Sequence, residues 1–206
     1  MKNCKAIIFD LGGVLLNIDY KLTIDAFEKL GIKNAISFYS KKIQNSIFDK
    51  IEVGEISPKI FLELLQKQTH NANLKAVENA WNAMLLDLPQ KRLKYIKKLK
   101  NTYKIFLLSN TNEIHINAFK RNLGNTKWGE FKSLFDKMYL SHEIGYRKPN
   151  KEVFQIILKE NGLQKMEVVF IDDSLQHIKA AENLGIKCHY LQETEDITEI
   201  FLDITQ

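Results

Sequence analysis

The chain has 206 residues, with a hydrophobic fraction of 45%, a charged fraction of 27% and a formal net charge of +5. These values are ordinary for a soluble globular protein with one domain, or with one domain that carries an insertion. The low counts of three prolines and nine glycines argue against long flexible linkers, and the mild positive charge identifies no partner by itself.

The first predicted element is a short apolar run at residues 6–9, which ends at Asp10. The run is too short for a signal-peptide core or a membrane span, so we expect a buried strand and no membrane partner. Cys4 and Cys188 lie in or beside apolar runs, and their spacing is not that of a zinc site. Two reduced core thiols are typical of a cytoplasmic protein, which is the location we expect.

Residues 15–88 carry helical patterns and no strand pattern of comparable quality. One apolar face stops at Gly31, and another spans residues 77–85. Between them, Ser57 followed by Pro58 has the form of a helix start with serine as the N-cap. We therefore expect an α-helical cap at residues 15–88, inserted after the first strand.

Residues 91–100 hold the densest group of basic side chains. Leu93, Ile96 and Leu99 recur there at helical spacing, so the bases fall on the opposite face of a helix. A solvated helix face explains this pattern, and no known nucleic-acid-binding motif accompanies the bases. We expect no nucleic-acid partner.

Five short apolar runs have the composition of buried parallel strands. They span residues 6–9, 104–108, 137–140, 168–171 and 187–191. Helical patterns follow Pro149 and Ser174, and they close at Gly162 and Gly185. Because strands and helices alternate with short connections, we expect an α/β fold with a Rossmann-like doubly wound parallel sheet, built from residues 1–14 and 89–206.

Polar residues gather where the predicted strands end. Ligands of open α/β sheets bind outside the carboxyl ends of the strands, so these residues would share one site. They comprise a carboxylate, a hydroxyl, two cations and a carboxylate pair, namely Asp10, Ser109, Arg147, Lys148, Asp172 and Asp173. This set suits phosphoryl transfer, in which a carboxylate attacks phosphorus while oxygen-bound Mg²⁺, cations and N–H groups neutralise the phosphoryl charge.

Four segments that contain these residues resemble, in order, the four motifs of the haloacid dehalogenase superfamily. They are Phe9-Asp10-Leu11-Gly12-Gly13-Val14, Leu108-Ser109-Asn110-Thr111, Arg147-Lys148-Pro149 and Phe170-Ile171-Asp172-Asp173-Ser174. The motifs are most similar to the branch that contains sugar-phosphate phosphatases, such as alpha-D-glucose-1-phosphate phosphatase, and the N-terminal phosphatase domain of soluble epoxide hydrolase. The resemblance implies an Mg²⁺-dependent phosphatase that acts on a small phosphorylated metabolite and carries a helical cap.

The resemblance also implies roles for single residues. Asp10 would be the nucleophile and a metal ligand, and the Gly12 carbonyl would be a second ligand. Asp173 would bind the metal, with Asp172 nearby or acting through water. Ser109 and Lys148 would take part in catalysis, and the expected phosphate-binding groups are Ser109, Asn110, Lys148 and the glycine loop at Gly13.

Gly12 departs from the pattern of the family, in which most phosphatases carry a second aspartate at this position as general acid and base. Without that acid, substrates with a less basic leaving oxygen should lose least in rate. We therefore expect sugar 1-phosphates to be preferred over 6-phosphates. Asp19 and His177 are the candidates for the missing proton transfer.

Three other functions stay open on the sequence. A dehalogenase would use the same aspartate without a metal, although the pair Asp172-Asp173 would repel an anionic substrate. A phosphate-binding or regulatory protein that has lost turnover would be consistent with Gly12. A signalling receiver domain combines similar residues, but here the acid pair comes late in the chain. The sequence leaves the exact substrate and the oligomeric state open.

Overall fold

The computed structural model describes residues 3–38 and 46–200; residues 1–2, 39–45 and 201–206 of the predicted core and cap lie outside the described part. Its centre is a five-stranded parallel sheet in the order β3-β2-β1-β4-β5. The strands are β1 (Ala6–Phe9), β2 (Lys104–Ser109), β3 (Lys137–Leu140), β4 (Val168–Asp172) and β5 (Lys187–Tyr190). The predicted doubly wound α/β fold is confirmed.

The register of the strands brings the ends of β1 and β4 to one level. Phe9 of β1 pairs with Leu107 of β2 on one side and with Ile171 of β4 on the other. The next residue on β1 is Asp10, so it leaves the sheet beside Asp172. Every residue of β1 is fully buried, as expected for the central strand of a parallel sheet.

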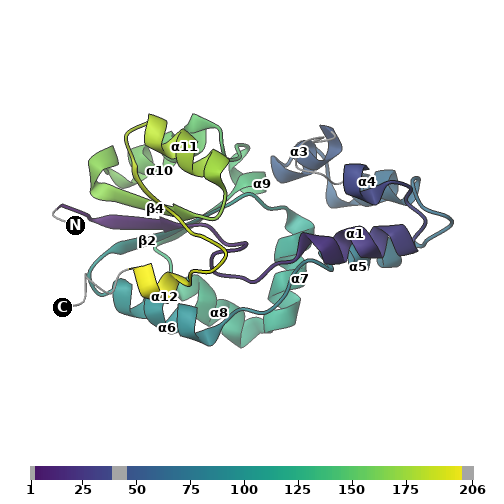
Figure 1. The fold of residues 1–206 in the computed structure, drawn as a ribbon, viewed down its shortest axis with the longest axis horizontal. Coiled ribbons are helices and arrows are strands. Elements are labelled where there is room, and N and C mark those ends of the chain that lie inside the picture. The colour runs from purple at the N-terminus through teal and green to yellow at the C-terminus, as the bar shows by residue number, and fades with distance from the viewer. Residues whose placement is uncertain (1–2, 39–45, 201–206) are drawn as a thin grey trace.

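Helices cover both faces of the sheet (Figure 1). One layer contains α10 (Lys151–Asn161) and α11 (Leu175–Asn183), with α9 (Ser141–Ile144) and the short 3₁₀ helix η1 (Lys165–Glu167) on the connections. The other contains α6 (Gln90–Leu99), α7 (Glu113–Leu123), α8 (Asn125–Ser133) and α12 (Ile197–Ile200). Side chains of β1 alternate between the two layers, because Ile8 belongs to the apolar cluster around Phe154, and Ile7 to the cluster around Ile96.

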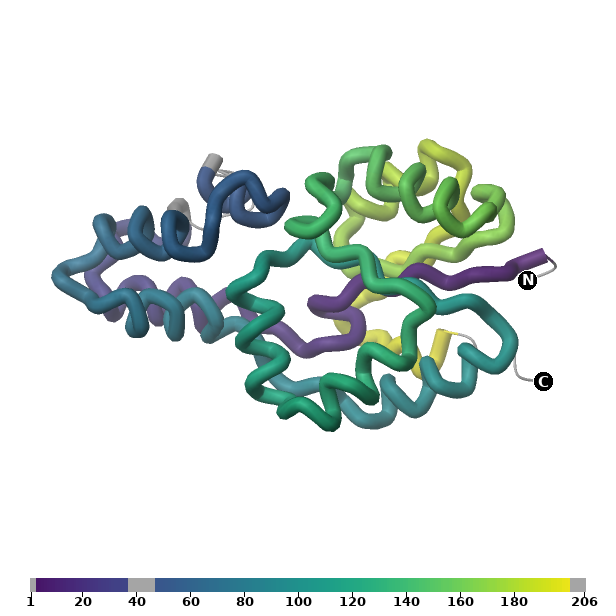
Figure 2. Tube along the Cα trace, turned by 180° about the vertical axis from the view of Figure 1, so that it is seen from behind, coloured from purple at the N-terminus to yellow at the C-terminus, as the bar shows by residue number. Residues whose placement is uncertain are grey.

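The described residues between β1 and β2 form five helices ahead of α6. They are α1 (Tyr20–Lys29), α2 (Ala35–Phe38), α3 (Ser46–Glu52), α4 (Pro58–Gln66) and α5 (Leu74–Asn82). We call this segment, residues 20–82, the cap, and the rest of the chain the core. The cap extends beyond the carboxyl ends of the strands (Figures 1 and 2). Its helix α4 begins as predicted, because the Ser57 hydroxyl oxygen accepts the Ile60 N–H at 3.3 Å.

The cap has an apolar centre of its own around Trp81. The rings of Phe27, Phe48 and Phe61 lie with their centroids 5.0–6.3 Å from the Trp81 ring. Aromatic side chains at these distances contribute both buried area and favourable ring geometry. The cap therefore holds its shape through packing and not only through its attachment to the sheet.

The apolar pattern at residues 77–85 predicts a longer helix than the structure contains. Helix α5 ends at Asn82, and the Met84 N–H donates to the hydroxyl oxygen of Thr23 at 3.1 Å. The buried Thr23 of α1 thus binds the backbone that would have continued the helix. Met84 and Leu85 belong instead to the connection back to the core.

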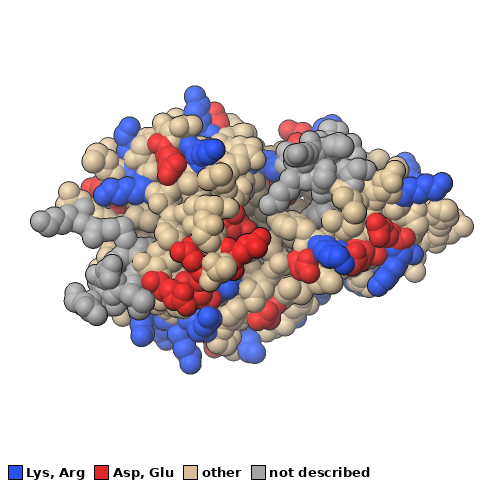
Figure 3. All heavy atoms as spheres, in the orientation of Figure 1, with Lys and Arg blue, Asp and Glu red and all other residues tan. Residues whose placement is uncertain are grey.

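Charged side chains are spread over the face seen in Figure 3. Lysine and arginine lie mainly at the margins of the core and the cap, and acidic residues lie nearer the middle of this face. The net charge of +5 is therefore not gathered into one basic surface on this side. Within the two described ranges, no helix has the length and apolar character needed to cross a bilayer.

Candidate active site

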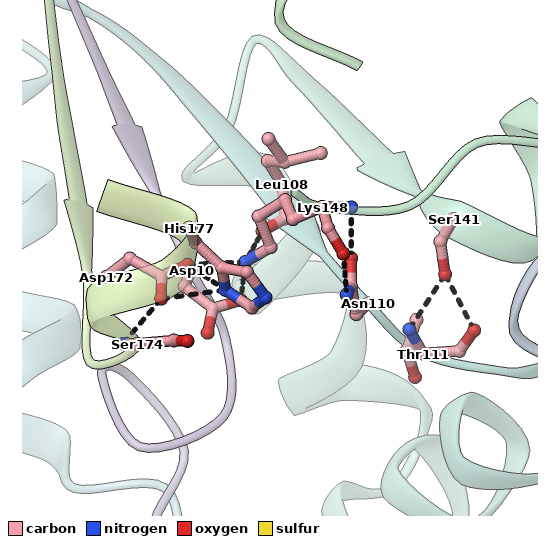
Figure 4. Close-up of polar contacts among 9 residues, drawn as sticks. All are labelled: Asp10, Leu108, Asn110, Thr111, Ser141, Lys148, Asp172, Ser174 and His177. Carbon is pink, nitrogen blue, oxygen red and sulfur yellow. Dashed lines mark hydrogen bonds and ion pairs between the residues drawn. The ribbon is translucent and has the colours of Figure 1, made fainter. Parts of the chain in front are cut away.

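Lys148 lies among buried carboxylates at the end of the central strands (Figure 4). Its Nζ is 2.7 Å from Oδ1 of Asp10 and 2.6 Å from Oδ2 of Asp172, and it donates to the Leu108 carbonyl oxygen at 3.1 Å. Only 1% of the Lys148 side chain is exposed. Burial acts to lower the pKa of Lys148, but the two carboxylates raise it above its ordinary value, so the ammonium stays charged.

The Asn110 side chain holds the backbone of Lys148 in place. Its Nδ2 donates to the Lys148 carbonyl at 2.8 Å, and its Oδ1 accepts the Lys148 N–H at 2.8 Å. The peptide bond that follows, between Lys148 and Pro149, is cis. Asn110 is a predicted phosphate-binding residue, and its amide also fixes the position of the buried cation.

Three carboxylates meet beside Lys148. One oxygen from each of Asp10, Asp172 and Asp173 lies within 4.8 Å of the others. Asp172 is fully buried, and its Oδ1 accepts the Ser174 N–H at 2.7 Å and lies 3.0 Å from His177 Nδ1. A cluster of carboxylate oxygens is the donor set that a hard divalent cation such as Mg²⁺ prefers.

The two buried carboxylates of this cluster, Asp10 and Asp172, have pKa values that are shifted in opposite directions. Burial raises the pKa of Asp10 to about 7, with Lys148 opposing it and the charges of Asp172 and Asp173 adding to it. Burial acts in the same direction on Asp172, but Lys148 and His177 lower its pKa to about 2. A cation bound at the cluster would relieve the repulsion that raises the pKa of Asp10.

The glycine loop after Asp10 passes directly against Asp173. Gly13 has a φ of +79°, and a Cβ atom there would lie 2.3 Å from Oδ2 of Asp173. Only glycine fits this position without strain. The Gly13 N–H donates to the Leu16 carbonyl at 2.9 Å, so in this structure it is engaged within the loop and not with the expected phosphate position.

Ile18 fills the space beside Gly12. A Cβ atom on Gly12 would lie 3.0 Å from Cδ1 of Ile18, and Gly12 does not have a positive φ. The position therefore allows an L-residue by its backbone but is crowded by one methyl group. Of the two candidates for proton transfer, His177 lines the cavity described below, whereas Asp19 caps α1 by accepting the Lys21 N–H at 2.8 Å.

A buried serine braces the loop that follows β2. The Ser141 Oγ accepts the Thr111 N–H and donates to the Thr111 carbonyl, both at 2.9 Å (Figure 4). Ser109, the last residue of β2, is buried and lines the cavity. The brace fixes the direction of the chain immediately after Ser109.

A cavity of about 390 Å³ lies between these core residues and the cap. Asp10, Ser109, Lys148 and Asp173 face it from the core. The described cap residues in its lining are Tyr20, Ile24, Ile36, Phe48, Glu52 and Trp81. Glu52 is the charged member of that group, and no motif in the sequence marks it as a site residue. Burial and the charge of Asp10 raise the pKa of Glu52 to about 7, against the opposing effect of Lys148.

His115 of α7 joins the core to Trp81 of the cap. Its Nε2 lies 3.2 Å from the Trp81 carbonyl oxygen, and the two rings stack with centroids 4.6 Å apart. Burial lowers the pKa of His115 to about 4, so the ring is neutral at pH 7 and its Nε2–H donates to the carbonyl. A single histidine carries no sequence signal for this role.

Comparison with known families places the chain in one of them. Residues 4–185 match the family model of the haloacid dehalogenase-like hydrolases. The chain belongs to this family and is a hydrolase of the haloacid dehalogenase type.

Individual relatives are similar over nearly the whole chain. D-ribitol-5-phosphate phosphatase of Bacteroides thetaiotaomicron is 30% identical over 184 residues, which cover 89% of both chains. A haloacid dehalogenase family enzyme of the same bacterium, solved in complex with magnesium and inorganic phosphate, has a TM-score of 0.89 at 33% identity and covers 96% of this chain and 98% of that chain. A predicted HAD-like family hydrolase of Porphyromonas gingivalis has a TM-score of 0.85 at 27% identity, with 99% of each chain covered.

Proposed function

We propose that this hydrolase is a Mg²⁺-dependent phosphatase of a small phosphorylated metabolite, with Asp10 as its nucleophile. The observation that carries the proposal is the buried contact of Lys148 with Asp10 and Asp172, with Asp173 beside them. These groups offer a nucleophilic carboxylate, an ammonium and metal-binding oxygens at one point. The relative named as a phosphatase, and the similar enzyme solved with magnesium and inorganic phosphate, support the same function.

The reaction would proceed in two displacements at phosphorus. A carboxylate oxygen of Asp10 attacks phosphorus and the bond to the leaving oxygen breaks, which gives an aspartyl-phosphate and, after protonation, the alcohol. Water then attacks the same phosphorus, the bond to Asp10 breaks, and inorganic phosphate departs. Lys148 and the Ser109 hydroxyl would stabilise the charge on the phosphoryl oxygens in both steps.

Asp10, the Gly12 carbonyl and Asp173 would hold Mg²⁺, which would neutralise charge on the phosphoryl group when bound. Asp172 would act from behind this shell, because its oxygens are already occupied by Lys148 and other donors. Because of these contacts, Asp172 would serve mainly to position the Lys148 ammonium beside Asp10. Gly13 would serve to shape the loop after Asp10.

Two substrate classes are candidates. Gly12 provides no acid for the leaving oxygen, which favours sugar 1-phosphates because their anomeric oxygen is less basic. The name of the relative D-ribitol-5-phosphate phosphatase favours the second class, open-chain polyol phosphates. The leaving group of such an ester is a primary alkoxide of the polyol. A polyol phosphate would require an acid from elsewhere, and His177 is an imidazole in direct contact with the carboxylate cluster.

Phosphate release from sugar 1-phosphates, sugar 6-phosphates and polyol phosphates, measured with Mg²⁺ and with EDTA, tests the proposal. We expect multiple turnover of at least one class in Mg²⁺ and none in EDTA. Full phosphate release in EDTA would contradict the Mg²⁺ dependence of the proposed phosphatase. Release of halide from a haloacid, without phosphate release from any ester, would favour the metal-independent dehalogenase. Phosphate binding without turnover of any ester would favour a catalytically weakened binding protein.

A further inference from the structure

An ion pair connects Arg147 of the core to helix α3 of the cap. The Nε of Arg147 lies 3.0 Å from Oε2 of Glu52, and the guanidinium also pairs with Asp49. Arg147 directly precedes Lys148, so this contact lies at the edge of the catalytic cluster. The Arg147 guanidinium therefore pairs with two acidic side chains of the cap, Asp49 and Glu52.

A second contact fixes the same junction. Gly54 follows α3 with a φ of +73°, and a Cβ atom there would lie 2.4 Å from the carbonyl oxygen of His142 in α9. Figure 1 shows α3 beside α9 at the boundary between the cap and the core. Because Gly54 and Arg147 both tie α3 to the core, the position of Glu52 relative to Lys148 is set by two separate contacts.

Glu52 and Asp49 differ in where they face. Glu52 lines the cavity and its side chain is 22% exposed, whereas Asp49 is outside the cavity lining and its side chain is 41% exposed. Both pair with Arg147. Their carboxylates therefore share a partner and a helix, but only Glu52 can meet a bound molecule.

Positive charge along the described cavity lining is already matched. Lys148 pairs with two carboxylates, Arg147 pairs with two acids of α3, and His177 lies against Asp172. His115 binds a backbone carbonyl. An anionic group on the part of a substrate that reaches the cap would thus find Glu52 and uncharged aliphatic and aromatic side chains in place of an available cation.

We propose that Glu52 is a specificity-determining residue that selects uncharged, hydroxyl-bearing leaving groups and rejects leaving groups with a second negative charge. The inference rests on the proposed phosphatase function, because it concerns the organic part of an ester whose phosphate is bound at Lys148. A carboxylate accepts strong hydrogen bonds from hydroxyls, and it repels a second anion in a partly desolvated site. Monophosphates of uncharged sugars and polyols fit this site, whereas bisphosphates and phosphorylated carboxylic acids do not.

Matched substrate pairs test the inference at about pH 8.5, where Glu52 is ionised because this pH lies above its pKa of about 7. Ribitol 5-phosphate and ribonate 5-phosphate differ only by a hydroxymethyl group and a carboxylate, as do glucose 1-phosphate and glucuronate 1-phosphate. With the pair that the wild-type enzyme hydrolyses, we expect kcat/KM to favour the neutral member by at least about tenfold. In Glu52→Gln this ratio should fall at least about fivefold, mainly through KM, while Asp49→Asn should keep it within about twofold.

Asp49→Asn is a close control, since it changes the net charge equally and also removes a carboxylate partner of Arg147. Inhibition by inorganic phosphate reports the core site, and its inhibition constant should be unchanged in both variants. An unaltered ratio in Glu52→Gln, or an equal change in Asp49→Asn, would overturn the inference. Absence of Mg²⁺-dependent turnover with every ester would overturn the proposed function itself, which keeps the two failures distinguishable.

Discussion

The Asp10 carboxylate is the group on which the proposed chemistry depends at the scale of single residues. Asp10→Asn keeps the size of the side chain but removes the anionic oxygen that would attack phosphorus. We expect kcat to fall by at least ~10³ in a phosphate-release assay, as for other covalent nucleophiles. Lys148 keeps Asp172 as a partner, so the variant should stay folded by circular dichroism. Retention of more than a tenth of wild-type activity would rule out an aspartyl-phosphate on Asp10.

Gly12 and Ile18 together determine whether an acid can assist the leaving oxygen. The Cβ of an aspartate at residue 12 would lie 3.0 Å from Cδ1 of Ile18, which is a crowded contact, and valine at residue 18 lacks that atom. We expect wild-type kcat/KM to depend steeply on the pKa of the leaving group, and the double variant Gly12→Asp with Ile18→Val to show a flatter dependence. General acid assistance is worth about 10²–10⁴ in rate for the most basic leaving groups.

A series of aryl and alkyl phosphates measures this dependence. Ile18→Val alone is the control for the lost methyl group, and its slope should equal that of the wild type. A flat slope in the wild type would show that another residue already supplies the proton. In that case His177, which lines the cavity, is the first residue to test.

Gly54 controls the docking of one cap element, helix α3, on the core. Gly54→Ala would place a Cβ atom 2.4 Å from the His142 carbonyl oxygen. Gly145 has the same φ of +73°, but a Cβ atom there would meet no heavy atom of the described residues within 4 Å, so Gly145→Ala isolates the backbone strain. Both should lose roughly 1–2 kcal/mol of unfolding free energy from that strain. We expect Gly54→Ala alone to raise KM as well, because it displaces Glu52. Equal KM values in the two variants would show that α3 docking does not affect substrate binding.

The junction of α5 and α7 should make stability depend on pH. The pKa of His115 is about 4 in the folded protein, below its ordinary value of 6.5. Between these values the unfolded chain binds a proton that the folded protein does not. The contribution is therefore fully present above pH 6.5 and is lost as pH falls toward 4. The loss at pH 5, relative to pH 7.5, is about 2 kcal/mol.

Urea unfolding at pH 7.5 and pH 5 checks this prediction. His115→Gln retains a donor for the Trp81 carbonyl but does not titrate. Between pH 7.5 and pH 5, its unfolding free energy should therefore fall by about 2 kcal/mol less than that of the wild type. His70→Gln, at a histidine of the cap outside this junction, controls for the loss of an imidazole. Equal pH dependence in His115→Gln and the wild type would contradict the buried neutral state of His115.

Sequence patterns predicted the strands more completely than the helices at residues 113–133. Strands buried on both faces are continuous apolar runs, which are distinct in any sequence. Helix α8 contains Gly129, and Phe131 is its one buried residue, so it lacks the apolar periodicity that marks a helix. The packing of Phe131 against Phe119 and Phe135 supports it instead, and such tertiary contacts are not visible in a local pattern.

At the scale of the whole molecule, the motif residues could be placed at one edge from the sequence, because parallel strands present their carboxyl ends together. The fit of the cap over that edge could not. It depends on Arg147 meeting acids of α3 that are distant in sequence, and on the close approach at Gly54. Acidic residues on helices are usually solvated, so Glu52 differs from its neighbours only after folding.

Metal binding should stabilise the whole fold, because the carboxylates of Asp10, Asp172 and Asp173 repel one another in the apo protein. At a Mg²⁺ concentration of 100 times Kd, the unfolding free energy should rise by about 2.7 kcal/mol, and EDTA should remove the gain. Asp173→Asn should lose most of this increase, yet be more stable than the wild type in EDTA, since one repelling charge is gone. Asp49→Asn, away from the cluster, should keep the increase. Thermal melts with and without Mg²⁺ measure these shifts independently of turnover, and an undiminished shift in Asp173→Asn would remove Asp173 from the metal site.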